Sequence, residues 1–237
     1  MCGEPQANSY IRLGFVYTEE GKTDEALDIL RQGLSNVPGD YDVYRIYIST
    51  LRRAEKYDEI IEDFHEESYR GITLDPEIWN NLGFAYAKKE KWHEAKEAYN
   101  RALSLDHKYA EAFYNLGNAY LSQATKDRNI KPLQKSSENF QKAIDTDPNY
   151  PSPYFGLGMV CRILRNSDGA IYNLKKAVEL RPDFDSAYYY LGLTYLEKGA
   201  KSQALACFTT IKEKFFFGYS EDQKRRIDAL IEQCKDR

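Results

Sequence analysis

The sequence predicts an all-α protein built as a solenoid of stacked helix pairs, and three observations carry this prediction. Residues 76–109 contain two apolar stripes of helical spacing, separated by a polar turn at residues 88–91. Neither helix can bury its stripe alone, so each pair needs a neighbour on both sides. The same pattern of about 34 residues returns in altered form from about residue 7 to residue 218. An array of helix pairs satisfies all three observations.

The clearest copy of the pattern is residues 76–109. Its first stripe, at the spacing i, i+3, i+4, i+7, consists of Trp79, Leu82, Gly83 and Tyr86. Its second stripe consists of Ala95, Ala98, Tyr99 and Ala102. Small residues at these positions allow two helices to approach closely.

We divide the chain into one array of six units and a terminal helix. The units span about residues 7–40, 41–75, 76–109, 110–150, 151–184 and 185–218, and the terminal helix spans residues 219–237. In the first unit Leu13 and Gly14 match the first stripe. The second unit is degenerate, because Tyr47 and Ile48 stand where the other units have Leu and Gly. We expect its helices to pack more loosely than the others.

The fourth unit contains an insertion in residues 122–136. Its Phe113 and Phe140 are 27 positions apart, whereas Trp79 and Tyr99 are 20 apart. We expect two lengthened helices and a longer loop, with Pro132 in the first turn of the second helix. The alternative is a partner site, because the insertion is rich in Lys and Arg.

The last residues of the chain predict a capping helix. Ser220 and Gln223 form a capping-box pattern, and the residues that follow are apolar on one side and charged on the other. A terminal helix with a polar outer face closes an open array.

Together these units resemble the tetratricopeptide repeat, a 34-residue helix–turn–helix marked by an aromatic residue, Leu-Gly, Tyr, Ala, Phe, Ala and Pro. The resemblance covers nearly the whole chain and is partial in residues 41–75. It implies a right-handed superhelix whose first helices line a concave groove and whose second helices form the convex back. It also implies that the protein binds other proteins, often as extended peptides or helices in that groove.

Composition and motifs argue against several other functions. The net charge is −4 with both signs spread along the chain, so nucleic acid is not an expected partner. The 4 cysteines and 3 histidines are scattered without metal-ligand spacing, and no catalytic set or phosphate-binding loop is present. We therefore predict a protein that is not an enzyme and has no cofactor, metal or small-molecule substrate.

The candidate binding residues lie on the first helix of each unit, off the core stripe. One group is a ladder of amides that can pair with a peptide backbone, and it consists of Asn81, Asn115 and Asn118. A second group is aromatic or apolar and suits an apolar segment or an amphipathic helix. This group consists of Phe84, Tyr114, Phe155, Met159, Tyr189, Tyr190 and Leu193. The alternative is that these side chains pack against neighbouring layers.

One subtype of the family can be rejected. A chaperone-tail clamp needs Lys and Arg on its third first helix, to hold the terminal carboxylate of a peptide. The nearest window of this sequence places Glu111 and Asn115 there instead, and Glu111 would repel that carboxylate.

Two function classes remain. The first is a non-enzymatic scaffold that binds a peptide or helix of a partner protein in its groove. The alternative is a membrane-tethered or self-associating assembly factor, similar at family level to the six-repeat lipoproteins that assist pilus secretin assembly. In that case Cys2 would carry the lipid. We expect a cytoplasmic location, or a periplasmic lipoprotein if the native chain has a leader before Cys2.

Overall fold

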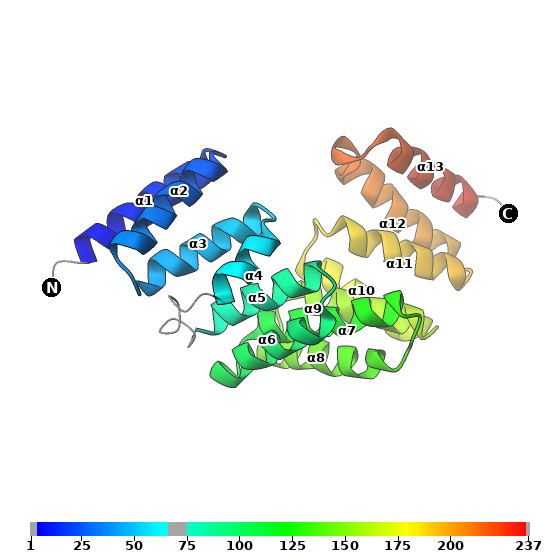
Figure 1. The fold of residues 1–237 in the computed structure, drawn as a ribbon. Coiled ribbons are helices and arrows are strands. Elements are labelled where there is room, and N and C mark those ends of the chain that lie inside the picture. Colours follow the sequence, from blue (N-terminus) through cyan, green and yellow to red (C-terminus); the bar gives the residue numbers. More distant parts are fainter. Residues whose placement is uncertain (1–3, 66–74, 236–237) are drawn as a thin grey trace. The chain divides into compact units, whose positions relative to one another are not determined.

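The computed structural model describes residues 4–65 and 75–235, and every element within these ranges is a helix. Figure 1 shows the helices following one another as neighbouring pairs. The chain divides into two compact units, Met1–Ala119 and Tyr120–Arg237, and the boundary between them falls inside α7. Each unit is described by itself below.

The first unit is built from helix pairs. Its helices are α1 (Glu4–Glu19), α2 (Thr23–Asn36), α3 (Tyr41–Arg53), α4 (Tyr57–His65), α5 (Pro76–Lys88), α6 (Trp92–Leu105) and the first part of α7 (Ala110–Lys126). The start of α5 is set by its sequence, because the Asp75 carboxylate accepts hydrogen bonds from the backbone N–H groups of Glu77 and Ile78, and Pro76 occupies the first turn. The Asp40 carboxylate caps α3 in the same way.

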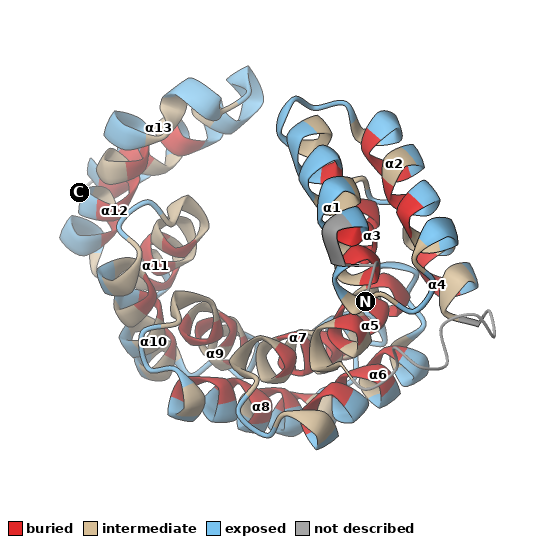
Figure 2. Cartoon of the chain, turned by 90° about the vertical axis from the view of Figure 1, so that its left-hand side faces the viewer, coloured by how far each residue is buried: buried red, intermediate tan, exposed pale blue. Residues whose placement is uncertain are grey.

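The second unit continues the series of pairs. It contains the end of α7, then α8 (Pro132–Thr146), α9 (Pro151–Ile163), α10 (Ser167–Leu180), α11 (Asp185–Glu197), α12 (Lys201–Lys214), the short 3₁₀ helix η2 (Phe216–Gly218) and α13 (Glu221–Lys235). Helix α13 buries Ile227, Ile231 and Cys234 against α12. Its remaining face is largely exposed (Figure 2). The predicted capping box is confirmed, because Ser220 N–H donates to Gln223 Oε1 at 2.8 Å and Gln223 N–H donates to Ser220 Oγ at 3.3 Å.

Glycine on the first stripe lets the two helices of a pair touch. A Cβ atom at Gly83 would lie 2.7 Å from the Tyr99 ring, and one at Gly192 would lie 2.7 Å from the Phe208 ring. Both distances are shorter than van der Waals contact, so any larger residue would push the pair apart. The Leu-Gly pattern thus specifies the close packing of first and second helices.

The insertion lengthens the fourth pair as expected. Helix α7 has 17 residues where α5 has 13, and Pro132 opens α8. In the connecting loop, the Asn129 side chain accepts a hydrogen bond from Lys131 N–H at 3.0 Å.

One expectation differs from the structure. Tyr47 and Ile48 of the degenerate unit are 2% and 1% exposed, so both are buried, and the looser packing expected for the helices of this unit stays a prediction. Leu13 is 45% exposed although it lies on the predicted core stripe. Its counterparts Leu82 and Leu191 are 2% and 4% exposed, because a preceding pair lies beside α5 and α11.

None of the described helices combines the length and the apolar character needed to cross a bilayer. Cys2 and residues 66–74 lie outside the described residues.

Candidate functional site

The first helices of the first unit carry a network of polar side chains centred on Arg52. The Arg52 guanidinium donates to Asn81 Oδ1 at 2.7 Å and to Glu111 Oε1 at 3.3 Å. Asn80 donates to the same Glu111 oxygen at 3.3 Å and accepts from the Asn115 amide at 2.9 Å. Three successive first helices, α3, α5 and α7, are therefore linked by one set of hydrogen bonds.

This network balances its own charge. Arg52 also lies over the Phe84 ring, with its Cζ atom 4.5 Å from the ring centroid. Burial, together with the charge of Glu111, raises the pKa of Tyr109, whose hydroxyl accepts a hydrogen bond from Asn80. Because the guanidinium already has a carboxylate and an amide partner, it offers little to an external anion.

An equivalent arginine ties together two first helices of the second unit. Arg162 in α9 donates to the Glu197 carboxylate at 2.7 Å and 3.2 Å, and it also bonds the Thr194 hydroxyl in α11. Its guanidinium lies 5.6 Å from the centroid of the Tyr190 ring. Thr194 is fully buried and donates in turn to the Tyr190 carbonyl. The charge of Arg162 is thus also matched inside the protein.

Aromatic rings cover the first helices of the second unit. The Phe155 ring lies 4.9 Å from Phe184 and 5.9 Å from Tyr190, measured between centroids. Tyr190 and Tyr189 meet edge to face at 5.3 Å, and Tyr189 reaches Phe208 at 6.4 Å. Phe208 is fully buried, whereas the other rings are half-buried and still present a partly exposed surface. Met159 and Leu193 on the same two helices are half-buried as well.

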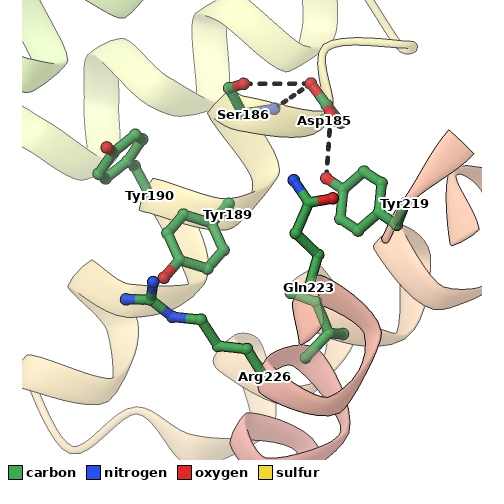
Figure 3. A pocket seen from close by; sticks show the side chains of 8 residues that line it. Asp185, Ser186, Tyr189, Tyr190, Tyr219, Gln223 and Arg226 are labelled. Atoms are coloured by element: carbon green, nitrogen blue, oxygen red, sulfur yellow. Dashed lines mark hydrogen bonds between the residues drawn. The ribbon is translucent and has the colours of Figure 1, made fainter. Parts of the chain in front are cut away.

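A pocket of about 260 Å³ lies between α11 and α13 (Figure 3). Its walls are Asp185, Ser186, Tyr189, Tyr190, Tyr219, Gln223, Arg226 and Ile227. The Asp185 carboxylate accepts from Ser186 N–H and from the Tyr219 hydroxyl at 2.9 Å. Burial and this hydrogen bond raise the pKa of Tyr219. Arg226 lies over the Tyr189 ring, 5.4 Å from its centroid.

The described residues contain no cluster of three or more His, Cys, Asp or Glu side chains arranged to hold a metal ion. Tyr and Arg side chains such as those described above are enriched in protein–protein interfaces.

Family models of the tetratricopeptide repeat match this chain in several places. A model described as "TPR repeat" matches residues 85–123 and 166–199, and two described as "Tetratricopeptide repeat" match residues 186–215 and residues 7–36. The matches fall on the helix pairs described above. The chain is a tetratricopeptide repeat protein.

Two curated relatives illustrate the similarity of this repeat protein to others. The type IV pilus assembly protein PilF of Pseudomonas aeruginosa is 28% identical over 151 residues, which cover 61% of this chain and 55% of PilF. The human protein O-mannosyl-transferase TMTC3 is 29% identical over 159 residues, which cover 65% of this chain. The chain spans only 16% of TMTC3, so the resemblance is confined to a part of that protein.

Solved structures of low sequence identity share the fold. Pseudomonas aeruginosa PilF superposes with a TM-score of 0.73 at 16% identity, covering 96% of this chain and 100% of that one. PilW, described as a widely conserved type IV pilus biogenesis factor, gives 0.75 at 16% identity, covering 93% and 98% of the two chains. The all-α solenoid of helix pairs is therefore shared with known tetratricopeptide repeat proteins.

Among the predicted binding residues of this repeat protein, the amide ladder differs most from what we expected. Asn81 and Asn115 are 1% and 7% exposed and are bonded to Arg52 and Asn80, so they do not line an open surface as we expected. Their role in linking helices explains their burial, since a buried amide must find partners inside the protein. Asn118 is half-buried.

The predicted aromatic positions fall into two groups. Phe84 and Tyr114 belong to the first unit and are half-buried, and Phe84 is covered in part by Arg52 and by Tyr57, 6.0 Å away. The second-unit group described above also remains half-buried. All of these residues stay predicted binding positions.

The sequence patterns missed the arginines and the contribution of the terminal helix. Arg52 and Arg162 each stand eight positions after the aromatic residue that begins the first stripe of their unit, Tyr44 and Tyr154, so a comparison of equivalent positions could have paired them. The role of Tyr219, Gln223 and Arg226 depends on how the packing of α13 against α12 brings them beside Tyr189 of α11, and no short sequence pattern indicates this.

Proposed function

We propose that this tetratricopeptide repeat protein is a non-enzymatic scaffold that binds a peptide or helix of a partner protein along the first-helix face of α9 and α11. Tetratricopeptide repeats are protein-interaction modules, and the proposal concerns which face binds. The observation that supports it is the half-buried aromatic strip of Phe155, Met159, Tyr189, Tyr190 and Leu193. Rigid aromatic side chains gain much contact area at low entropic cost, so they are favoured anchors for a partner.

The first unit is a weaker candidate for the same role. Its equivalent face is occupied by the Arg52 network, whose polar groups already bond one another. A ligand that inserted there would have to replace buried hydrogen bonds, whereas on α9 and α11 it would cover apolar surface that is still partly in water.

Met159→Lys tests this face without removing an aromatic stack. Met159 follows Phe155 by one helical turn on α9 and is half-buried. We expect a charged side chain there to weaken partner binding at least tenfold, because a desolvated lysine is costly in an apolar contact. The matched control is Tyr172→Lys, since Tyr172 is an aromatic residue on the second helix α10 and is 68% exposed. The double variant Phe155→Ala/Tyr189→Ala gives a second probe of the strip.

The measurement is a pull-down from the native source with wild type and variants side by side, followed by affinity measurement on the purified partner. A partner retained by Tyr172→Lys and lost by Met159→Lys supports the face. If a genuine partner binds both variants equally well, the α9–α11 face is not its site. Circular dichroism confirms that each variant is folded before binding is compared.

A second candidate function is favoured by the extent of one structural match. The chain covers 100% of the PilF structure and 98% of PilW, against 44% of the Cut9 complex structure that superposes with a similar TM-score of 0.75. This supports an assembly factor for type IV pili, membrane-tethered through Cys2 or self-associating. At 16% identity the match supports the fold, and the role is our inference from the shared length.

Disruption of the gene in its source organism tests that role. We expect loss of surface pili, counted by electron microscopy and restored by the wild-type gene. Normal piliation in the disrupted strain would remove this candidate and leave the scaffold proposal standing. A Cys2→Ser variant that restores pili as well as wild type does would remove the lipid tether alone.

A further inference from the structure

We propose that the pocket between α11 and α13 binds an acidic side chain, Asp or Glu, of the partner segment that lies along α9 and α11. This inference rests on the proposed scaffold function and adds a charge requirement to it. The pocket supports this inference because several of its hydrogen-bond donors have no acceptor among the residues that the structure describes, whereas its carboxylate already accepts hydrogen bonds.

Three donor groups line the pocket without a partner in the described part of the chain. The Tyr189 hydroxyl is buried and bonds no other group among residues 4–65 and 75–235. The Gln223 side chain accepts from Ser220 N–H through Oε1, which directs its NH₂ group elsewhere as a donor. No carboxylate of the described residues lies within ion-pair distance of Arg226, whose guanidinium lies beside Tyr189 (Figure 3).

The acidic residue of the pocket is already committed. One oxygen of Asp185 accepts from the backbone N–H and the hydroxyl of Ser186, at 2.5 Å and 3.1 Å, and the other accepts from the Tyr219 hydroxyl at 2.9 Å. Asp185 therefore orders the pocket wall and does not neutralise Arg226. Asp185 keeps its negative charge, but its oxygens are bonded at the Ser186 and Tyr219 side of the pocket, and the donors that the described residues leave unpaired lie at the Arg226 and Tyr189 side (Figure 3). That side of the pocket is the complement of a carboxylate.

Two arginines on first helices show what Arg226, on α13, lacks. Arg52 has Glu111 and Arg162 has Glu197, so both charges are matched within the protein. Neighbours of Arg226 on α13 are matched as well, since Arg225 pairs with Asp222 and Lys224 with Glu221. Arg226 differs from all of these by facing a pocket and having no carboxylate partner among the described residues.

The walls of the pocket also fit a side chain better than a free ion. The rings of Tyr189 and Tyr190 and the side chain of Ile227 provide apolar surface for the methylene groups of an acid. Tyr190 belongs both to the pocket and to the aromatic strip, so a segment bound on the strip passes beside the pocket. The Arg226 side chain covers the Tyr189 ring and has to shift for a carboxylate to reach both groups.

The experiment selects ligands directly and does not require the partner to be identified first. A phage-displayed library of random peptides is selected on the full chain, and the affinities of selected peptides are measured by fluorescence anisotropy. We expect Asp or Glu to be enriched at one position next to apolar residues. Replacing that residue by Asn or Gln is expected to weaken binding about tenfold, the effect of losing a charge-assisted contact.

Two variants and a matched control locate the acid. Arg226→Gln is expected to weaken the acidic peptide about tenfold and to leave its amide analogue unchanged. Tyr189→Phe removes one hydrogen bond and is expected to weaken it about threefold. Arg225→Gln carries the same charge change on the adjacent, exposed residue and is expected to have no effect.

Several outcomes overturn the proposal. Peptides that lose affinity with Met159→Lys but show no preference for an acid would refute the pocket and keep the scaffold function. Equal effects of Arg225→Gln and Arg226→Gln would mean that only overall charge matters. A preference abolished by amidation of the peptide C-terminus would assign the carboxylate to a chain end.

A direct probe covers the case in which no peptide is selected. N-acetyl-glutamate and N-acetyl-glutamine are titrated separately into the labelled protein, and the side-chain N–H signal of Arg226 is followed by NMR. We expect saturable shifts with the glutamate compound only. The absence of such shifts would refute the pocket whatever the peptide selection gives.

Discussion

Arg52 and Arg162 stand at the same position of two different repeats. Both link neighbouring first helices, but they bond different partners. Each lies over an aromatic ring of the next first helix, Phe84 for Arg52 and Tyr190 for Arg162. Arg52 bonds a buried amide, Asn81, and finds its carboxylate two first helices further on, in Glu111. Arg162 bonds Thr194 and Glu197, both on the adjacent helix α11.

The difference between these arginines explains why the two faces differ. The Arg52 network joins three helices, and the polar groups on the first-helix face of the first unit are already hydrogen-bonded to one another. The bonds of Arg162 to Thr194 and Glu197 lie near the end of α11, and the aromatic side chains nearer its start, Tyr189 and Tyr190, stay half-buried, although Arg162 also lies over the Tyr190 ring. A cation on a repeat surface therefore indicates a binding site only when its counter-charge is missing from the same protein.

The largest expected effect tests whether the apolar core is equally well packed in the two regions that contain Arg52 and Arg162. Leu82→Ala and Leu191→Ala should each destabilise their unit by about 3 kcal/mol, because both leucines are almost fully buried. Leu13→Ala, at the equivalent position but 45% exposed, should cost less than about 1 kcal/mol. The free energy of unfolding is measured by urea denaturation. Costs at Leu82 and Leu191 that differ strongly would show that the regions already differ in their apolar packing.

Removal of each arginine should have the next largest effect, and the two effects should be unequal. Arg52→Met is expected to destabilise by about 2 kcal/mol, because it leaves the buried Asn81 amide oxygen without its donor. Arg162→Met should cost only about 1 kcal/mol, since Thr194 keeps its bond to the Tyr190 carbonyl and Glu197 can return to water.

A double-mutant cycle separates the amide from the charge. If the cost of Arg52→Met comes from Asn81, the same substitution made in an Asn81→Leu background should cost clearly less than in wild type. An unchanged cost would assign the effect to Glu111. Urea denaturation of the four proteins supplies the cycle.

The fold could be predicted from the sequence because the repeat pattern encodes local packing. The glycine of the first stripe packs against a residue of the second helix, as Gly83 does against Tyr99, and the same contact recurs at Gly192 and Phe208. Leu13 was assigned to the core by the same pattern and is exposed, because burial also requires a neighbouring layer and the pattern says nothing about its presence. The capping box was predicted because its two bonds join residues three positions apart.

The candidate site was predicted less completely because its contacts are not local. Asn81 was assigned to an open surface by its phase on the helix, but its partner Arg52 lies 29 positions earlier and the spacing rule does not include it. The pocket depends on Arg226 meeting Tyr189, a pair brought together only by the path of the chain through η2. Helical periodicity assigns a residue to a face, whereas the function of that face depends on which charges meet on it.

The smallest expected effect concerns a third arginine contact, between Arg45 and Glu77 at 3.8 Å. Burial raises the pKa of Glu77, and the attraction of Arg45 only partly opposes this rise. The folded protein therefore holds the Glu77 proton to a higher pH than the unfolded chain does. As pH rises above about 4.5, the ordinary value for Glu, this group lowers the free energy of unfolding, and the loss is complete above its folded pKa.

Glu77→Gln should remove this contribution, so the stability of the variant should fall less than that of wild type between about pH 4 and pH 7. The change should be small because the Glu77 side chain is 39% exposed and water screens its charge. Urea denaturation across this pH range is compared with Glu25→Gln, a control at an exposed carboxylate on α2. If Glu77→Gln and Glu25→Gln follow the same pH curve, Arg45 fully offsets the burial of Glu77. In that case the charge of Arg45, like the charges of Arg52 and Arg162, would be matched within the protein.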